Sequence, residues 1–283
     1  MMSEVAITPK PGLVDRANSG SHKDMDFFSF IDSASALLPW FRYCALAGFD
    51  SAKDKIKTPQ NLFESLRPPG REAEVLMKKA TGGVNVHRGY IFCFGLISAA
   101  YGRLYHNAEK PELTAVLNLV RGMTEKLGED FSSPNMRLNT KEASHGEKIY
   151  FQSGISGIRG EAAKGFPSVT EHALPLLRAM LKGGNSLNDA GIAALLKLLA
   201  HAEDTNIIHR GGIAALKAIQ EDLKSFFAGN KMPGERVVEA LREKAAALDR
   251  EFIAKNLSPG GSADLLGVTL FLYKLMDIKS QNL

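Results

Sequence analysis

The sequence has little cysteine and no long hydrophobic run. Its two cysteines, Cys44 and Cys93, both lie inside apolar stretches of the 283-residue chain. Their number and spacing exclude a disulfide framework and a cysteine-based zinc site, so we expect two core thiols in a reducing cytoplasm. The longest apolar run, Tyr90–Tyr101, is shorter than the roughly 20 residues of a membrane span. The N-terminal residues also lack the pattern of a signal peptide.

Several familiar catalytic motifs are absent as well. The chain contains no G-x-x-x-x-G-K-[ST] phosphate loop, no G-x-G-x-x-G after a strand, no H-E-x-x-H and no G-x-S-x-G. These absences exclude the common phosphate-binding loop, the dinucleotide-binding turn, the zinc peptidase helix and the serine hydrolase elbow. Phosphate chemistry in this chain would therefore need an unusual helical frame.

The charge is close to balanced. The chain has 35 basic and 31 acidic residues and a net charge of +4. The two signs are mixed along the sequence, whereas a nucleic-acid-binding protein more often concentrates basic residues in a patch. We therefore expect no nucleic acid and no membrane as a partner, and a small anionic ligand fits the balance better.

Helical spacing dominates what is present. Apolar residues recur at helical intervals through most of the chain, two-residue alternation is lacking and β-branched residues are sparse. We predict an all-α fold, a compact bundle of about ten or more helices, forming a single catalytic domain over residues 1–283. We expect a helix break at Pro68–Pro69–Gly70 and a loop over Gly128–Gly146.

Five polar clusters punctuate these helices. They are Thr8–Phe28, Gly82–Tyr90, Gly157–Ser168, Glu203–Gly212 and Ser258–Leu266. The first has no apolar period, which is typical of a loop. The fifth has two glycines that open a helix, and taken alone it favours ordinary N-capping without a ligand.

The second and fourth clusters resemble each other. Asn85, His87, Arg88 and Gly89 in "NVHRG" match Asn206, His209, Arg210 and Gly211 in "NIIHRG" with one inserted residue. An arginine and a glycine at a helix start place a guanidinium group beside free backbone N–H groups and the positive end of the helix dipole, which favours an anion. The alternative is a plain helix start whose arginine pairs with a carboxylate.

Asp24 and Asp26 stand one residue apart in the first cluster. In an extended segment their side chains point the same way, so both could bind one Mg²⁺ together with substrate phosphates. The competing interpretation is that these acids complement the dipole at the start of the following helix.

Five stretches together resemble the triphosphoribosyl-dephospho-CoA synthase family: "PKPGLVDRANSGSHKDMDFFSF", "NVHRGYIFCFGLISAAYG", "RGEAAKGFPSV", "DTNIIHRGG" and "SPGGSADLL". The resemblance extends from about Glu4 to Leu270, nearly the whole chain. It implies an all-helical enzyme that takes ATP and 3'-dephospho-CoA, releases adenine and joins the triphosphoribosyl unit to the 2'-hydroxyl of dephospho-CoA. The product would be the prosthetic-group precursor of citrate lyase or malonate decarboxylase, which a separate transferase attaches to an acyl carrier protein.

The resemblance selects the candidate site residues, and the division of roles among them follows from chemistry. Asp24 and Asp26 would hold Mg²⁺ on the triphosphate. Asp204 or Glu161 would be the base or would stabilise positive charge at the ribose C1', and His22, His87 and His209 could bind phosphate or protonate the leaving adenine. The residues expected to contact substrate are Lys10, Arg16, Arg88, Arg159 and Arg210 on phosphates, Asn18, Asn85 and Asn206 on sugar hydroxyls, and Gly12, Gly20, Gly89, Gly211, Gly260 and Gly261 where the backbone approaches the ligand.

Two other functions use the same residues. One is a Mg²⁺-dependent all-helical hydrolase that cuts a nucleotide with water as the acceptor. The other is a non-catalytic CoA- or nucleotide-binding partner of an acyl carrier protein, which leaves Asp24 and Asp26 unexplained.

Overall fold

All regular secondary structure in the described part of the chain is helical, as the spacing of apolar residues predicted. The computed structural model describes residues 1–53, 58–107, 110–127, 149–151, 153–230 and 235–277, and no strand occurs within them. The predicted loop over Gly128–Gly146 lies outside the described residues. The helices are α1 (Met2–Val5), α2 (Phe27–Ala36), α3 (Leu38–Ser51), α4 (Pro59–Ala80), α5 (Arg88–Tyr105), α6 (Leu113–Thr124), α10 (Gly157–Ala163), the π-helix η1 (Ser168–Ala173), α11 (Leu174–Lys182), α12 (Leu187–Leu199), α13 (Thr205–Gly229), α14 (Glu235–Ala254) and α15 (Gly260–Asp277).

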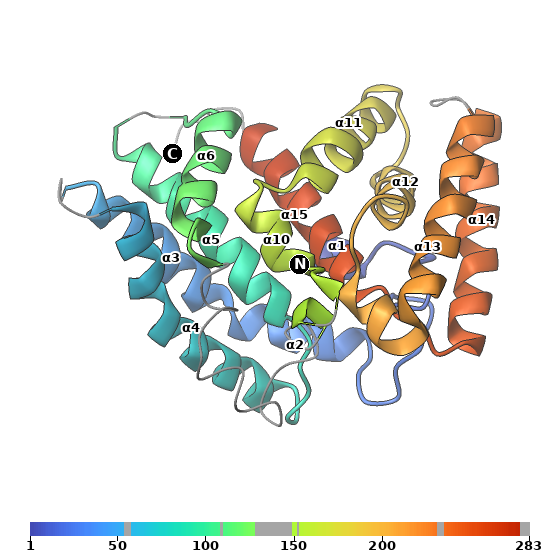
Figure 1. Ribbon diagram of the computed structural model, residues 1–283, viewed down its shortest axis with the longest axis horizontal. Coiled ribbons are helices and arrows are strands. Elements are labelled where there is room, and N and C mark those ends of the chain that lie inside the picture. The colour runs from blue at the N-terminus through green and yellow to red at the C-terminus, as the bar shows by residue number, and fades with distance from the viewer. Residues whose placement is uncertain (54–57, 108–109, 128–148, 152, 231–234, 278–283) are drawn as a thin grey trace.

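Three apolar helices form the centre of the core. Nearly every side chain of α12 from Ala190 to Leu199 is buried, and α5 and α15 are buried over most of their length. Helix α15 packs against both α5 and α12. In Figure 1, α3 and α4 lie on one side of α15, and α13 and α14 lie on the other. One cluster of buried hydrophobic side chains runs from Ile7 to Leu272, while the single domain over 1–283 stays a prediction.

Glycines bring α3 and α5 into close contact. A Cβ atom on Gly48 would lie 2.0 Å from the Ala99 carbonyl oxygen, and one on Gly102 would lie 2.0 Å from that of Ala45. Two backbones can approach this closely only where side chains are missing, so this pair of glycines sets the position of α5 and of the residues that precede it.

The predicted break at Pro68–Pro69–Gly70 is wrong, because α4 continues through both prolines. A proline inside a helix costs about 3 kcal/mol, but a continuous apolar stripe offsets this cost. Leu62 and Leu66 before the prolines and Ala73 and Met77 after them are all buried on the same core. Tertiary burial therefore overrides a local signal that is normally reliable.

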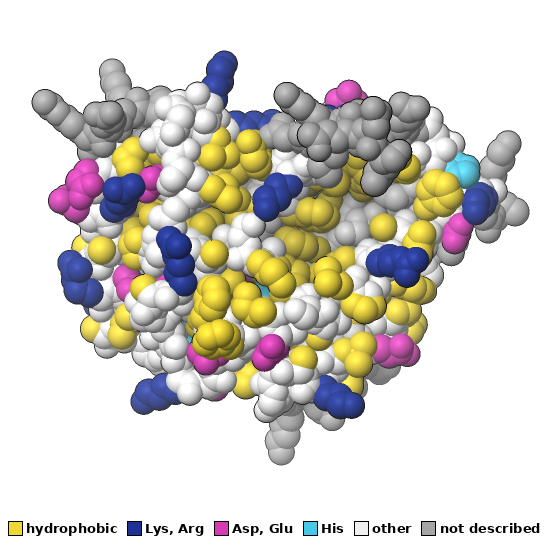
Figure 2. All heavy atoms as spheres, turned by 180° about the vertical axis from the view of Figure 1, so that it is seen from behind, with side chains coloured by type: hydrophobic (Ala, Val, Ile, Leu, Met, Phe, Trp, Pro, Cys, Tyr) yellow, Lys and Arg dark blue, Asp and Glu magenta, His cyan; other side chains and the backbone are white. Residues whose placement is uncertain are grey.

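In the face drawn in Figure 2, Lys and Arg side chains are scattered among acidic and hydrophobic ones. Within the described residues, no helix is long and apolar enough to cross a lipid bilayer.

Candidate active site

Asp204 joins the starts of two helices. Its Oδ1 accepts hydrogen bonds from the backbone N–H groups of Asn206 (2.9 Å) and Ile207 (3.2 Å) at the start of α13. Its Oδ2 accepts from the N–H (2.7 Å) and hydroxyl (2.9 Å) of Ser262 at the start of α15. Burial raises the pKa of this carboxyl, and the hydrogen bonds from Ser262 act in the opposite direction. Four donors occupy the two oxygens, so Asp204 acts as a cap shared by both helices.

Other helix starts gather around this joint. A Cβ atom on Gly260, the first residue of α15, would lie 2.5 Å from Nδ2 of Asn206. One on Gly89, at the start of α5, would lie 2.0 Å from Oδ2 of Asp264 in α15, and Gly157 of α10 lies against Thr205 of α13 in the same way. The N-termini of α5, α10, α13 and α15 are thus neighbours, and the positive ends of their dipoles lie close together.

A cavity of about 190 Å³ opens at the starts of α5, α13 and α15, and we call it the central cavity. Four of the five polar clusters contribute to it. Its charged or polar lining residues are Glu4, Lys10, His22, Asn85, Arg88, Asn206, Arg210, Ser258 and Asp264, and its glycines are Gly89 and Gly260. The sequence prediction brought Lys10, His22, Asn85, Arg88, Gly89, Asn206, Arg210 and Gly260 together without knowledge of the fold, and all of them line this one space.

The cations of the central cavity have different surroundings. The Lys10 ammonium is buried and pairs with Glu4, whose other oxygen, Oε2, is buried without a hydrogen-bond partner. Arg210 is exposed and donates from Nη1 to the carbonyl oxygens of Ser21 (3.3 Å) and Asn256 (3.2 Å). Lys10 is therefore fixed and neutralised by its partner, whereas Arg210 presents its charge to solvent and to the cavity.

Asp264 is a candidate that the sequence prediction left out. Burial, and then the nearby carboxylates Glu4 and Asp204, raise the pKa of Asp264 well above its usual value. A carboxyl with a raised pKa next to a cavity is a common property of catalytic acids and bases. The signal was present in the sequence, since Asp264 lies in the "SPGGSADLL" stretch, but ordinary N-capping of a helix also explains that stretch.

His22 lies at the edge of the central cavity. Its Nε2 is 2.8 Å from the hydroxyl of Ser258, and its Nδ1 is 3.7 Å from Oδ1 of Asp24. Burial and the positive charge of Arg210 lower its pKa, and Asp24 opposes them. His22 is therefore placed to interact with a ligand as a neutral imidazole at neutral pH.

Asp15 and Asp249 hold the opening loop in place. Asp15 accepts hydrogen bonds from the backbone N–H groups of Lys10, Ala17 and Asn18. Buried Asp249 of α14 accepts from the Gly12 N–H (2.9 Å) and from Nδ2 of Asn18 (3.1 Å). The polar stretch is a loop because its backbone donors bind carboxylates, and this network positions Lys10 and His22.

Several predicted contact residues support this loop and lie outside the lining of the central cavity. Gly20 donates its N–H to Oδ1 of Asn18 (2.6 Å), and a Cβ atom on Gly12 or on Gly211 would meet Leu257. Arg16 is exposed and donates to Oδ1 of Asn188 (3.3 Å). Gly261 lies against Asp204. Substrate-binding roles for Gly12, Arg16, Asn18, Gly20, Gly211 and Gly261 stay predictions.

The two similar motifs occupy different positions on their helices. Helix α5 begins at Arg88, as predicted. Helix α13 begins at Thr205, so Arg210 and Gly211 follow the first turn and precede a kink at Gly212, where φ is 80°. The prediction of a helix start at Arg210 is wrong, because Asp204 caps the chain earlier and Gly212 interrupts it later.

The other two histidines lie outside the lining of the central cavity. His87 caps α5 in the core, with its Nδ1 2.7 Å from the hydroxyl of Ser33 and its Nε2 buried without a partner. Burial, followed by the charges of the N-terminus and Lys10, lowers the pKa of His87 to about 3, so it is neutral at pH 7. His209 is exposed on α13.

The third cluster lies beside the central cavity. Both oxygens of Glu161 bind Ser168, accepting from its N–H (3.1 Å) and its hydroxyl (2.5 Å). Burial raises the pKa of Glu161, and these hydrogen bonds oppose the rise. Glu161 lines a separate hollow with His172 and His201, and Arg159 lines a larger cavity that it shares with Arg88.

The two aspartates proposed for Mg²⁺ differ in how far their carboxylates are already engaged in hydrogen bonds. Asp26 is the N-cap of α2, and its Oδ1 accepts from the N–H (2.9 Å) and the hydroxyl (2.8 Å) of Ser29. Asp24 is exposed beside His22. No group of three or more His, Cys, Asp or Glu residues in the described part of the chain is arranged to hold a metal ion. Mg²⁺ commonly uses one or two carboxylates with phosphate oxygens and water, so Asp24 fits such an ion better than Asp26 does.

The arrangement suits a polyphosphate ester that reacts beside a carboxylate. Helix N-termini, Arg88 and Arg210 supply N–H groups and positive charge for phosphate oxygens. Asp264 and Glu4 supply acidic groups in the same space. A positive centre that forms between the phosphates and these carboxylates would be stabilised by the latter.

Comparison with known proteins agrees with this chemistry. The family described as ATP:dephospho-CoA triphosphoribosyl transferase matches residues 1–282. The chain is 41% identical over 278 residues to a probable 2-(5''-triphosphoribosyl)-3'-dephosphocoenzyme-A synthase of Vibrio cholerae, covering 98% of this chain and 86% of the relative. It is 40% identical over 270 residues to the synthase of Pectobacterium atrosepticum (95% and 84% covered) and 41% identical over 276 residues to that of Klebsiella pneumoniae (96% and 87%).

No solved structure matches the chain, so the placement of the site rests on the geometry described above. The family match covers almost every residue, and it includes all the clusters that line the central cavity. The chain therefore belongs to the ATP:dephospho-CoA triphosphoribosyl transferase family.

Proposed function

We propose that this transferase binds the triphosphoribosyl part of ATP in the central cavity and passes it there to the 2'-hydroxyl of 3'-dephospho-CoA. One observation carries the proposal: the N-termini of α5, α13 and α15, together with Arg88 and Arg210, surround a space that also contains Glu4 and Asp264. A phosphate binder needs only the positive groups. A site that also forms positive charge on a sugar needs carboxylates beside them.

The reaction exchanges one bond at C1' of the ATP ribose for another. The C1'–N9 bond to adenine breaks and a bond from C1' to the 2'-oxygen of dephospho-CoA forms. The hydroxyl proton leaves the attacking oxygen, and the departing adenine gains one proton. We assign Asp264 as the base that accepts the hydroxyl proton, because it lines the central cavity beside Gly89 at the start of α5 and because burial raises its pKa. The four donors on Asp204 and the Ser168 bonds on Glu161 make these two carboxylates poorer candidates.

Arg88 and Arg210 are the phosphate-binding groups in this proposal. Both are exposed and line the central cavity from different helices. Arg88 also pairs with Glu74 at 3.4 Å, which orients the guanidinium group while leaving donors for a ligand. Lys10 contributes through its ion pair with Glu4, which holds that carboxylate beside the cavity.

Mg²⁺ would bind the triphosphate oxygens with Asp24 as its protein ligand, and it would neutralise part of the phosphate charge. Replacing Asp24 with Asn should raise the Mg²⁺ concentration needed for half-maximal adenine release. The control is Asp32→Asn, because Asp32 is also exposed and lies within α2, the helix that Asp26 caps. An unchanged Mg²⁺ requirement in Asp24→Asn would remove the metal role.

The biological setting extends the proposal. The product would be the prosthetic-group precursor that a separate transferase attaches to an acyl carrier protein, of citrate lyase or of malonate decarboxylase, and the enzyme would work in the cytoplasm. The family membership does not favour the hydrolase or the non-catalytic binding module.

Incubation of the protein with ATP and dephospho-CoA tests the function. We expect adenine and a product whose mass equals dephospho-CoA plus the triphosphoribosyl unit, with little adenine when dephospho-CoA is omitted. Adenine or phosphate released at the same rate without dephospho-CoA would identify a hydrolase instead.

A further inference from the structure

A second and larger cavity adjoins the central one. It measures about 470 Å³, within the range of small-molecule sites. Both cavities include Arg88 in their lining, so they meet at this residue. We call the second one the arginine cavity, and its charged lining residues are Arg67, Arg71, Glu74, Arg88 and Arg159.

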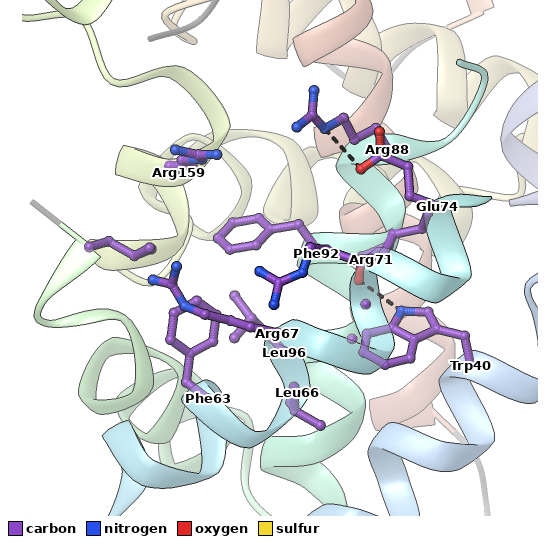
Figure 3. Close-up of a pocket in the computed structure, with 14 residues that line it drawn as sticks. Trp40, Phe63, Leu66, Arg67, Arg71, Glu74, Arg88, Phe92, Leu96 and Arg159 are labelled. Carbon is purple, nitrogen blue, oxygen red and sulfur yellow. Dashed lines mark hydrogen bonds and ion pairs between the residues drawn. The ribbon is translucent and has the colours of Figure 1, made fainter. Parts of the chain in front are cut away.

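The arginine cavity combines positive charge with an apolar floor. Figure 3 shows Arg71 beside Phe92 and Arg67 beside Phe63, with Arg88 and Arg159 farther along the same space. The floor consists of Trp40, Phe63, Leu66, Phe92 and Leu96. The lining carries four arginines and one carboxylate, and two of these arginines, Arg67 and Arg88, pair with Glu64 and Glu74.

Arg71 is the clearest sign of a ligand. It is exposed on α4 and makes no hydrogen bond or ion pair with the rest of the described chain. Arg67, one turn earlier, pairs with Glu64 at 3.0 Å and lies over the Phe63 ring, with its guanidinium carbon 4.8 Å from the ring centroid. Arg67 is thus held by the protein, whereas Arg71 points into the cavity (Figure 3) with its donors available.

This division of space suits two substrates of different size. The central cavity is small and contains the carboxylates Glu4 and Asp264, so it suits a ribose triphosphate at the reacting centre. The larger cavity has arginines and an apolar floor but only Glu74 as an acid. A ligand with phosphate groups attached to a longer organic body fits this lining, and the proposed reaction requires the acceptor hydroxyl to reach the Arg88 junction.

We propose that the arginine cavity binds the acceptor, dephospho-CoA, with its diphosphate between Arg71 and Arg159 and its pantetheine arm on the apolar floor. The inference rests on the proposed function, since it assigns the second substrate to a place beside the same reacting centre. The acceptor ribose, next to the diphosphate in the molecule, then lies at Arg88 with its 2'-hydroxyl facing Asp264.

The variant Arg71→Ala tests this assignment, because its side chain supports no other part of the described structure. Exposed Arg178→Ala on α11, which lines neither cavity, is the matched control. One charge-assisted hydrogen bond contributes about 1.5–3 kcal/mol, so we expect the Kd of dephospho-CoA, measured by calorimetry without ATP, to rise about tenfold or more. The KM of dephospho-CoA should rise in parallel, and the KM of ATP should stay within about twofold.

Unchanged binding of dephospho-CoA in Arg71→Ala, or a rise in the KM of ATP alone, would overturn the assignment. That failure differs from failure of the proposed function. In the first case the unmodified protein still forms the triphosphoribosyl product, and in the second it forms none.

Discussion

Asp204 and Asp264 lie close together, at the start of α13 and near the start of α15. The structure nevertheless predicts different effects of substitution: loss of activity at Asp264 and loss of stability at Asp204. Asp264→Asn keeps the shape of the side chain but removes a group that can accept a proton. Loss of acid–base assistance typically lowers a rate by about 10²–10⁴-fold, and we expect kcat to fall by this amount. Stability should not fall, because burial and the charges of Glu4 and Asp204 already disfavour the ionised form of Asp264.

Asp204→Ala should act on stability instead. Its carboxylate caps α13 through Asn206 and Ile207 and binds the start of α15 through Ser262. Loss of one N-cap costs about 0.5–2 kcal/mol, so loss of a cap shared by two helix starts should lower the free energy of unfolding by about 1–4 kcal/mol. Urea unfolding measures this change, and adenine release per folded molecule measures kcat for both variants.

The pH dependence of stability and of kcat tests the assignment of Asp264 a second time. A folded-state pKa above the unfolded value means that the folded state holds the proton more tightly, so Asp264 lowers stability as pH rises through its folded pKa. At alkaline pH, the Asp264→Asn variant should therefore be more stable than the unmodified protein. As a base, Asp264 must be ionised, so kcat should rise with pH above the range of an ordinary carboxyl. An Asp264→Asn variant with unchanged kcat would refute the reasoning.

Three further predictions use the same neighbourhood. Gly89→Ala should lower kcat at least tenfold with the protein still folded, since the new Cβ would lie 2.0 Å from Oδ2 of Asp264; kinetics alongside circular dichroism checks this, and full activity would contradict the contact. Arg210→Ala should raise the KM of ATP about tenfold or more, by loss of a charge-assisted hydrogen bond, with Arg210→Lys partly restoring it; an unchanged KM would exclude Arg210 from the phosphate site. The pKa of His87 is lowered to about 3, so the unfolded state binds the proton first and His87 should lower the stability of the protein as pH falls from about 6.5 towards 3. The difference in unfolding free energy between the unmodified protein and His87→Gln should therefore shrink over that range. A constant difference would contradict the buried neutral imidazole.

Local patterns sufficed for the fold class and for much of the site. Apolar spacing predicts helices because burial of one face per helix dominates their stability. The polar clusters were recognised because arginines and glycines recur together at the ends of apolar helices, a pattern that favours an anion site. Lys10, Arg88 and Gly260 come from distant parts of the chain and line the same cavity, as a shared ligand requires.

The parts that escaped prediction depend on tertiary contacts. The α4 helix passes through Pro68 and Pro69 because both halves are buried on one core. Asp204 looked like a base, but its hydrogen bonds to Ser262, 58 positions along the chain, are invisible locally. Asp264 lies in a cluster that ordinary N-capping explains, and only the tertiary contacts with Gly89 and the nearby Glu4 carboxylate show its surroundings.

The most direct test is a crystal structure of the protein with ATP bound and dephospho-CoA omitted. The triphosphate should lie against Arg88, Arg210 and the start of α15, with C1' of the ribose facing Asp264. A triphosphate bound in the arginine cavity, or in the hollow beside His172 and His201, would contradict the account.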